Sequence, residues 1–362
     1  MKKHILTFIL LFFLLAALIC CVSCQNGATE TSAPANPAAD NSVETPAHEH
    51  SFGEWSVVEA ATCTEDGSET RKCSCGETET RTIPAAGHEY VNGVCTVCGD
   101  KLVSEGLSFT LNEDGAGYSV SGIGTCKDTE LFIPDVYEGK PVTSIAGSAF
   151  EDCEKLVSVT IPGSVTIIGN KAFSGCAGLT QVTIPEGVIS IGKFAFCDCA
   201  GLTEVTIPAS VDSIGEAAFA NCSGIAALSV SAGNQKYSSA GNCIIETAAG
   251  ILTAGCGASV IPTDGSVTSI GGWAFSGFSG ITDLTIPESV TLIGECAFFR
   301  CTRLASVTIP QSVTAIGDNA FGSCSRLQTV RYAGSEEQWF GISLGESNDP
   351  LTDAERICGY MP

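Results

Sequence analysis

The 362-residue sequence is short of basic residues. Lysine and arginine number 17 against 40 acidic residues, so the formal net charge is −23. Proteins that bind nucleic acid present clustered Lys and Arg to the phosphates, and no such cluster occurs here beyond Lys2 and Lys3. This shortage excludes nucleic acid as a partner.

Histidine is scarcer still, and its placement argues against catalysis. The sequence has four histidines, which are His4, His48, His50 and His88. Triads and general bases often depend on a histidine, so the long remainder of the chain cannot form a site of that kind. It also has no Walker, Gly-x-Ser-x-Gly or His-Glu-x-x-His pattern. We therefore expect no enzymatic activity.

The N-terminal apolar run is too short for a typical membrane-spanning helix. It covers residues 5–19, about 15 positions, whereas a spanning helix needs ~20. Together with Lys2 and Lys3 it predicts an export signal. The segment up to Ser23 and Cys24 resembles a bacterial lipoprotein signal, although Cys21 stands where that family usually has leucine. The resemblance implies a signal peptide at 1–23 and lipidation of Cys24, which would anchor the chain to the bacterial membrane at the cell surface. An ordinary cleaved signal and a retained helix are the alternatives.

Residues 24–47 are rich in Ala, Thr, Pro and Asn and predict a flexible linker.

Residues 48–100 combine few aliphatic residues with many cysteines and histidines. Two close cysteine pairs, each followed by glycine, occur at Cys73-Ser-Cys75 and Cys95-Thr-Val-Cys98. Paired thiolates at such spacing are typical of tetrahedral zinc sites. The pattern predicts a small module similar to a zinc ribbon, in which the zinc is structural.

The ligand set of this module stays open between two partitions. In the first, Cys73, Cys75, Cys95 and Cys98 share one zinc. In the second, His50, Cys63, Cys73 and Cys75 form the site, and His88, Cys95 and Cys98 are one ligand short. Disulfides are a further alternative outside the cytoplasm, but five cysteines cannot all pair internally. No acid is placed recognisably as the base of a catalytic zinc. The segment resembles small Cys/His modules of surface proteins from anaerobic bacteria, through His50-Ser-Phe52, Cys63-Thr64 and Gly87-His88-Glu-Tyr90.

Most of the remaining chain repeats with a period of 23. A Leu-x-x-Val-x-Ile-Pro pattern and an Ala-Phe pair recur, the latter ending at Phe150, Phe173, Phe196, Phe219, Phe275, Phe298 and Phe321. Such a period with Leu-x-x-Leu-x-Leu spacing predicts a leucine-rich repeat solenoid. Each coil would contribute one short parallel strand ended by proline, and the convex side would be irregular or briefly helical. Stacked coils would bury a continuous core.

Most cysteines of the repeats occupy one position, three residues after the phenylalanine. They are Cys153, Cys176, Cys199, Cys222, Cys301 and Cys324, and Phe278 stands in the same position of another repeat. A position that accepts Cys or Phe is predicted to be buried and apolar, so we expect free thiols there. Occasional disulfides between coils are the alternative.

These repeats resemble the BspA-like leucine-rich repeat family of bacterial cell-surface proteins over residues 107–345. The resemblance extends to a capping hairpin at 101–134, repeats at 135–330 with an irregular insert at 231–259, and a closing unit at 331–362 in which Trp339 and Phe340 cover the last coil. It implies a non-enzymatic protein that binds extracellular matrix, host or neighbouring-cell proteins. A passive structural or metal-handling envelope lipoprotein, or a glycan-binding module, is the alternative. We expect a monomer.

The residues that flank the central valine of each strand are predicted to form the concave binding face. The candidates are Gln181, Thr183, Glu204, Thr206, Asp283, Thr285, Ser306, Thr308 and Arg331. They are small and polar, without the aromatic anchors of tight interfaces, so we expect broad, weak binding. The threonine column is also simply a good β-former facing water. Further candidates break the repeat pattern, namely Tyr237 in the insert and Phe194, Trp273, Phe299, Arg300 and Arg303 at the edges.

Overall fold

A computed structural model describes residues 50–91, 93–100 and 102–360. The predicted signal peptide, Cys24 and the linker lie outside these residues. The described chain forms two compact units, one from residues 50–56 and 70–80 and the other from residues 57–69 and 81 onward. Within the described residues, no helix is both long and apolar enough to cross a bilayer.

The Cys/His region consists of short strands with almost no apolar core. A three-stranded sheet has the order β1-β2-β3, and β4 pairs with β5 as a hairpin. The bounds are Ser56–Glu59 (β1), Gly67–Lys72 (β2), Thr78–Ile83 (β3), Tyr90–Val91 (β4) and Val94–Cys95 (β5). Among its described residues, the buried hydrophobic side chains are Cys63, Cys73 and Cys95. The packing of aliphatic residues therefore does not hold this region together.

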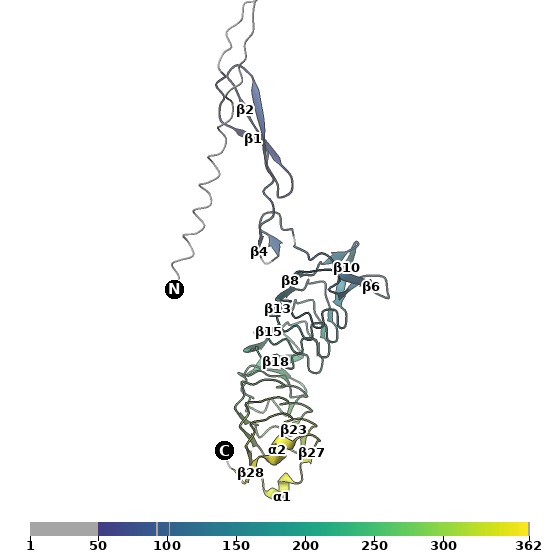
Figure 1. Cartoon of the computed structure of the whole chain (residues 1–362), viewed down its shortest axis with the longest axis vertical. Helices are drawn as coiled ribbons and strands as arrows, with labels where there is room; N and C mark the ends of the chain where they lie inside the picture. The colour runs from purple at the N-terminus through teal and green to yellow at the C-terminus, as the bar shows by residue number, and fades with distance from the viewer. Residues whose placement is uncertain (1–49, 92, 101, 361–362) are drawn as a thin grey trace, which may run out of the picture. The chain divides into compact units, whose positions relative to one another are not determined.

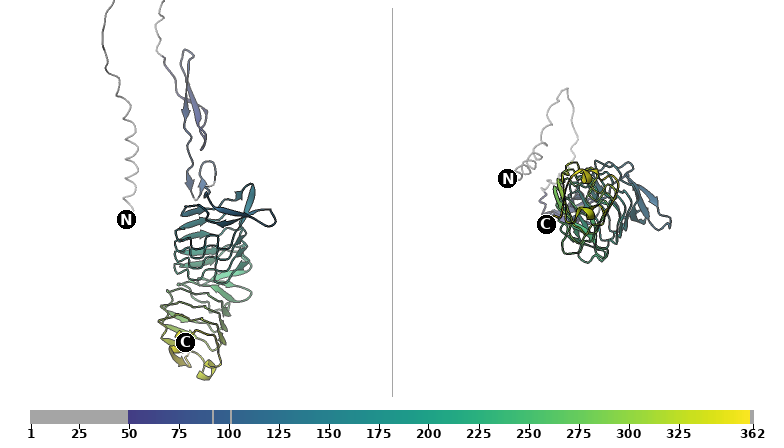
Figure 2. Two further views of the ribbon diagram at one scale, coloured as in Figure 1. Left: turned by 45° about the vertical axis from the view of Figure 1, so that its right-hand side comes forward. Right: turned by 90° about the horizontal axis from the view of Figure 1, so that it is seen from below.

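The rest of the chain is the predicted solenoid, with coils stacked one on another (Figures 1 and 2). One strand column holds the Leu-x-x-Val-x-Ile segments in three parallel sheets, β8-β11-β13, β15-β17 and β22-β24-β26-β28. Consecutive repeat strands pair with partners 23 residues apart, as in Val159 with Val182 and Leu284 with Val307. The bounds are Glu130–Phe132 (β8), Ser158–Thr160 (β11), Gln181–Thr183 (β13), Glu204–Ile207 (β15), Ala227–Val230 (β17), Asp283–Thr285 (β22), Ser306–Ile309 (β24), Thr329–Tyr332 (β26) and Glu355–Cys358 (β28).

A second strand column contains the other apolar pair of each repeat. Its two sheets are β6-β7-β10-β12-β14-β16, with β9 beside β10, and β18-β19-β20-β21-β23-β25-β27. The first bounds are Ser108–Leu111 (β6), Tyr118–Gly122 (β7), Val136–Tyr137 (β9), Lys140–Ile145 (β10), Ile167–Ile168 (β12), Ser190–Ile191 (β14) and Ser213–Ile214 (β16). The others are Tyr237–Ala240 (β18), Cys243–Glu246 (β19), Ile251–Ala254 (β20), Ser269–Ile270 (β21), Leu292–Ile293 (β23), Ala315–Ile316 (β25) and Ser343–Leu344 (β27).

The phenylalanines form a third column opposite the strands, built from turns. Rings of successive coils stack with centroids 5.1–5.6 Å apart from Phe150 to Phe219, and again 5.2 Å apart from Phe275 to Phe321. The residues two before and two after each phenylalanine have positive φ, and most of them are not glycine, such as Phe194 and Asp198. These left-handed residues turn the backbone so that amides between them donate to carbonyls of the next coil, as Phe196 does to Ala218.

The cysteine column is buried at five of its six positions, as the sequence predicts, and the prediction is wrong for Cys153. Cys176, Cys199, Cys222, Cys301 and Cys324 are at most 1% exposed, and Cys153 is half-buried. The five buried thiols each donate to the carbonyl of the phenylalanine 26 residues earlier, at 2.9–3.2 Å. Every described cysteine is a free thiol. A cysteine at this position therefore combines apolar packing with a weak donor to a backbone carbonyl.

The apolar core continues through the insert and into both caps. The insert is an antiparallel meander of β18, β19 and β20, and the amide of Asn221 still donates to the carbonyl of Ser276 across it, at 2.9 Å. The predicted capping hairpin is β6 and β7, but β8 before residue 135 already joins the strand column. One apolar cluster extends from Leu107 to Leu351.

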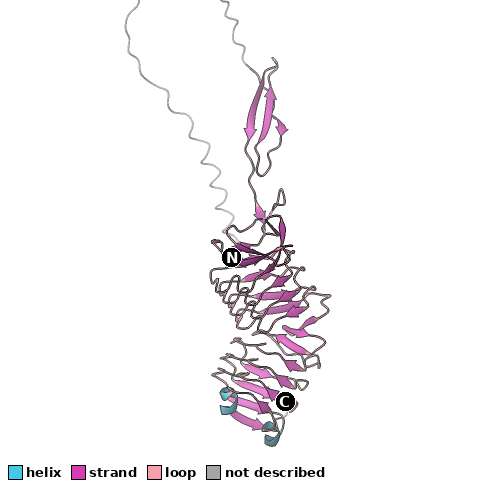
Figure 3. Cartoon of the chain, turned by 90° about the vertical axis from the view of Figure 1, so that its right-hand side faces the viewer, coloured by secondary structure: helices cyan, strands magenta, loops and turns pink. Residues whose placement is uncertain are grey.

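The C-terminal cap contains two short helices, α1 (Glu336–Trp339) and α2 (Asp349–Asp353), which are drawn cyan in Figure 3. Ser335 and Gln338 form a capping box at the start of α1. Trp339 packs against Tyr332 and is buried, as predicted. The prediction that Phe340 also covers the last coil is wrong, because Phe340 is 71% exposed and lies beside Arg356.

Candidate metal centres and strand face

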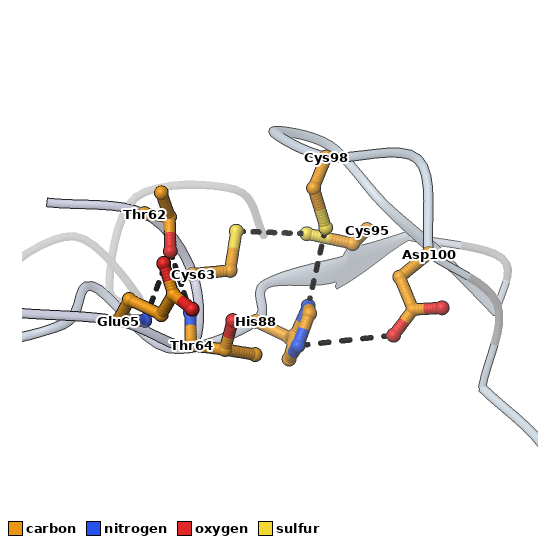
Figure 4. A network of polar contacts seen from close by, with 8 residues as sticks. All are labelled: Thr62, Cys63, Thr64, Glu65, His88, Cys95, Cys98 and Asp100. Carbon is orange, nitrogen blue, oxygen red and sulfur yellow. Dashed lines mark hydrogen bonds and ion pairs between the residues drawn. The ribbon is translucent and has the colours of Figure 1, made fainter.

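Four sulfur and nitrogen donors converge in the second unit (Figure 4). Donor atoms of Cys63, His88, Cys95 and Cys98 lie within 4.8 Å of one another. The Cys63 and Cys95 sulfurs are 3.7 Å apart, and the Cys98 sulfur is 3.4 Å from Nδ1 of His88. Three thiolates and one imidazole are a standard ligand set of structural zinc. The residues present therefore fit a zinc ion.

The turn after β5 places backbone amides within hydrogen-bonding distance of the Cys95 sulfur. Gly99, with φ +76°, lets the backbone fold back so that its amide donates to the Cys95 carbonyl. Amides of Cys98 and Val97 donate to the Cys95 sulfur and lower the pKa of this thiol to about 5. Burial and the neighbouring sulfurs raise the pKa of Cys63 to about 11. A metal at this site would displace the proton of Cys63, so its binding would be pH-dependent.

Asp100 orients the histidine of this cluster. Its carboxylate lies 3.8 Å from Nε2 of His88, on the side of the ring away from Cys98. A carboxylate behind a metal-binding histidine fixes the ring and raises its basicity. Sequence reasoning missed Asp100, although its place two residues after the last cysteine was a usable signal.

A second cluster lies in the first unit and contains three donors. Atoms of His50, Cys73 and Cys75 lie within 4.8 Å of one another, and Nδ1 of His50 is 3.3 Å from the Cys75 sulfur. The amide of Cys75 donates to the Cys73 sulfur and, with its thiol, lowers the pKa of Cys73 to about 6. Glu77 lies 3.7 Å from Nε2 of His50. This carboxylate was also missed, and it holds the same place after Cys75 that Asp100 holds after Cys98.

The structure groups the seven predicted metal ligands differently from either partition. Cys63 belongs with His88 because the amides of Ala86 and Gly87 donate to the carbonyls of Thr62 and Cys63, both at 3.0 Å. In the first unit, the amide of Gly53 donates to Lys72, and Phe52 pairs with Cys73. These long-range backbone contacts decide the grouping, and the spacing of the cysteines does not contain them.

Six of the nine predicted strand-face residues are exposed. They are Gln181, Thr183, Glu204, Thr206, Asp283 and Thr285. The first four line a depression of about 220 Å³, together with Glu186, Pro208 and Ser231. It lies where β13 ends one sheet and β15 begins the next. This part of the face is hollowed, hydroxyl-rich and acidic.

The prediction is wrong for Ser306 and Thr308, which are 6% and 7% exposed. Ser306 donates to Asp283 at 2.6 Å and accepts from Arg331, whose guanidinium lies over the ring of Tyr360. Arg331 is itself half-buried. The C-terminal cap therefore covers this end of the strand face.

The candidate residues that break the repeat pattern differ in whether they are buried or lie at the surface. Tyr237 is buried, with its hydroxyl accepting from the amide of Ile214, so it is part of the core and not a surface element. Phe194, Trp273 and Phe299 make edge contacts in a row of half-buried rings outside the core. Arg300 lies over Phe299, and Arg303 is exposed.

Comparison with known proteins identifies the repeats. The family described as "BspA type Leucine rich repeat region" matches in six copies over residues 141–247 and 254–339. No curated protein matches the chain. Among solved structures, a leucine-rich repeat protein of T. pallidum is 24% identical, with 68% of this chain and 86% of that chain covered and a TM-score of 0.37. One from Bacteroides ovatus is 24% identical, with 71% and 78% covered and a TM-score of 0.40. The pneumococcal vaccine antigen PcpA is 14% identical, with 84% and 99% covered and a TM-score of 0.39.

Proposed function

The chain belongs to the BspA-type leucine-rich repeat family, and on that premise we propose that it is a non-enzymatic binding protein of the bacterial cell surface. Its partners are extracellular or host proteins, or proteins of neighbouring cells, and the strand face of the solenoid binds them. Lipidation of Cys24 would anchor it to the membrane. The observation that carries this proposal is the depression lined by Gln181, Thr183, Glu204 and Thr206.

The chemistry of the depression indicates the kind of partner. Glu186 and Glu204 place two carboxylates beside a row of hydroxyl groups and one amide, on a chain whose net charge is −23. Opposite charge steers partners and favours correct docking. The preferred surfaces are therefore basic patches on proteins, and binding weakens as salt rises. Glycans, which also match hydroxyl-rich surfaces, are an outcome of the same test.

A panel of immobilised matrix and plasma glycoproteins and glycans tests the proposal by surface plasmon resonance with the full chain. We expect at least one probe to bind, and the triple variant Gln181→Ala, Glu204→Ala, Thr206→Ala to bind it at least about tenfold more weakly, a loss of ~1.4 kcal/mol. Asp212→Ala is the matched control, because it removes an exposed acid that directly precedes β16 and does not line the depression. If the triple variant bound the probe as tightly as the parent chain, the proposal that the strand face binds partners would be refuted.

We also propose that Cys63, His88, Cys95 and Cys98 hold a structural zinc. Its support is the convergence of four donors in a region whose described buried hydrophobic side chains are cysteines. Zinc would supply the folding energy that the missing aliphatic core does not. Zinc content of the full chain by mass spectrometry tests this, and intact disulfides without zinc would refute it.

A further inference from the structure

We propose that three aromatic rings and a neighbouring column of carboxylates form a second interaction surface, which binds an extended, arginine-rich segment of a protein partner. The rings, called the aromatic row, belong to Phe194, Trp273 and Phe299, and the carboxylates, called the acidic column, belong to Glu216, Glu295 and Asp318. Both lie on the turns around the stacked phenylalanines, whereas the depression lies on the strand face. The proposal goes beyond the proposed function and needs neither that depression nor a metal.

The aromatic row crosses the insert and joins coils that are not adjacent. The ring centroids of Phe194 and Trp273 lie 6.0 Å apart, and those of Trp273 and Phe299 also lie 6.0 Å apart. Phe194 and Trp273 occupy the same repeat position, and Ala217 occupies it in the coil between them. Because the alanine is small, the two larger rings meet over it. At ~4.8 Å per coil, the row extends for about 14 Å over four coils.

The rings of the row are partly exposed to solvent. Phe194 and Trp273 pack against a cluster separate from the main apolar core, formed by Cys197, Ala217 and Ala220. These three small residues are buried, whereas the rings above them are half-buried. The row therefore presents aromatic surface on the outside of the solenoid.

The backbone at these positions does not favour aromatic residues. Phe194 has φ +55° and Trp273 has φ +63°, and bulky side chains are uncommon in left-handed backbone. In other coils small or polar residues take the same position, as Ser148 and Asn319 do. Residues held in such backbone cluster at functional sites. The choice of phenylalanine and tryptophan here thus indicates a binding role.

The acidic column lies beside the row. Its three residues are exposed, and each stands three positions before a stacked phenylalanine. The amide of Phe194 donates to the carbonyl of Glu216 at 3.0 Å, and the amide of Trp273 donates to the carbonyl of Glu295 at 2.9 Å. An acidic residue of the next coil therefore neighbours each of these two aromatic residues.

The thiol of Cys296, in the coil after Trp273, responds to the field of the acidic column. Burial, and then the charges of Glu295, Asp318 and Glu216, raise the pKa of this thiol to about 11. A field that disfavours a thiolate favours a cation. The surface is thus electrostatically complementary to a basic partner, in keeping with the net charge of −23.

The contacts of the chain's own cations indicate arginine as the recognised side chain. The guanidinium of Arg300 lies 5.3 Å from the ring centroid of Phe299, and Nζ of Lys193 lies 3.2 Å from the Glu216 carboxylate. A guanidinium can stack on an aromatic face and also form hydrogen bonds with a carboxylate. Acids two coils apart, as Glu216 and Glu295 are, lie ~10 Å apart, and an extended peptide advances ~3.3 Å per residue. Arginines three residues apart therefore match the column.

A fluorescein-labelled peptide of four Arg-Ser-Ser repeats tests the surface, with the full chain as titrant and fluorescence anisotropy as the readout. We expect binding that weakens as salt rises. Trp273→Leu removes a ring without changing the charge and should weaken binding about 3- to 30-fold. Trp273→Phe keeps a ring and should bind more tightly than Trp273→Leu. If Trp273→Leu bound as tightly as the parent, attraction to the net charge alone would explain the binding, and the proposal would be overturned.

A matched pair of charge changes tests the acidic column. Glu295→Gln should weaken binding of the peptide about 2- to 5-fold. Glu288→Gln removes an exposed acid of the turn after β22, away from the row, and should leave the affinity as it is. Equal affinities of the two variants would contradict the acidic column as part of the surface.

Two controls keep the result specific to this surface. Urea unfolding shows whether each variant is folded, and if Trp273→Leu is not, Phe299→Leu takes its place with the same expected loss. The triple variant Gln181→Ala, Glu204→Ala, Thr206→Ala separates this surface from the strand face. Peptide binding that falls in the triple variant and is unchanged in Trp273→Leu would assign the peptide to the strand face and overturn the proposal.

Discussion

Replacement of Phe298 by alanine tests whether the stacked phenylalanines hold the coils together. Phe298 is fully buried and lies between Phe275 and Phe321, with ring centroids 5.2 Å away on both sides. A buried Phe→Ala change leaves a cavity and costs ~3–5 kcal/mol. Each stacked ring pair contributes about 0.5–1.5 kcal/mol beyond burial. We therefore expect Phe298→Ala to fall at the upper end of the cavity range.

Phe219 provides an internal comparison. Among the described phenylalanines it stacks on Phe196 alone, at 5.6 Å, because the insert separates it from the next ring in sequence. Its alanine variant should cost less than Phe298→Ala by about one ring pair, ~0.5–1.5 kcal/mol. Phe340→Ala, at an exposed ring beside Arg356, should cost under about 1 kcal/mol.

Urea unfolding followed by far-ultraviolet circular dichroism measures these differences, provided that the slope with urea stays constant among the variants. Phe298→Leu is included because it keeps most of the side-chain volume and should have an intermediate cost. The reasoning would be refuted if the free energy of unfolding of Phe298→Ala lay within about 1 kcal/mol of that of the parent. It would also be refuted if Phe298→Ala and Phe340→Ala lowered the free energy of unfolding by the same amount.

Three further predictions concern the backbone, the thiols and the metal. At Ser323, which has φ +59°, Ser323→Val should be ~1–2 kcal/mol less stable than Ser323→Gly in urea unfolding, because left-handed backbone disfavours branched side chains. Burial raises the pKa of Cys176, Cys301 and Cys324, the last to about 12. Unfolded thiols lose their protons above pH ~8.5, so stability should be intact below that pH and fall above it, by ~1.4 kcal/mol per thiol at one pH unit higher. Unfolding midpoints that stay constant from pH 8 to 11 would contradict this. Cys98→Ser should release zinc and increase hydrogen exchange at residues 81–100 without changing the repeats, and unaltered zinc content would contradict it.

The repeat architecture could be predicted from sequence because one pattern specifies every coil. Leucine, valine, isoleucine, phenylalanine and cysteine recur at fixed positions, and each coil buries its apolar residues only against its neighbours. The paired left-handed residues around each phenylalanine were not foreseen, since glycine marks them in only some coils, as at Gly175 and Gly277.

The sites were less accessible to sequence reasoning, because contacts between distant segments decide them. Cys63 joins His88 through backbone hydrogen bonds at Thr62 and Cys63, and spacing alone left two other partitions open. The alternation of side chains along its strand predicts that Ser306 is exposed, yet Arg331 and the C-terminal cap cover it. Periodicity predicts the side of a strand on which a residue lies, but not what a cap places over that side.

Hydrogen exchange at the amide of Asn221 tests most directly whether the coils form one continuous stack. This amide donates to Ser276 across the insert, as the amide of Asp198 donates to Ala220 between adjacent repeats. Resolved by NMR on the full chain, the Asn221 amide should be protected to the same degree as that of Asp198. Exchange at Asn221 as fast as in an exposed loop, with Asp198 protected, would show that the stack breaks at the insert.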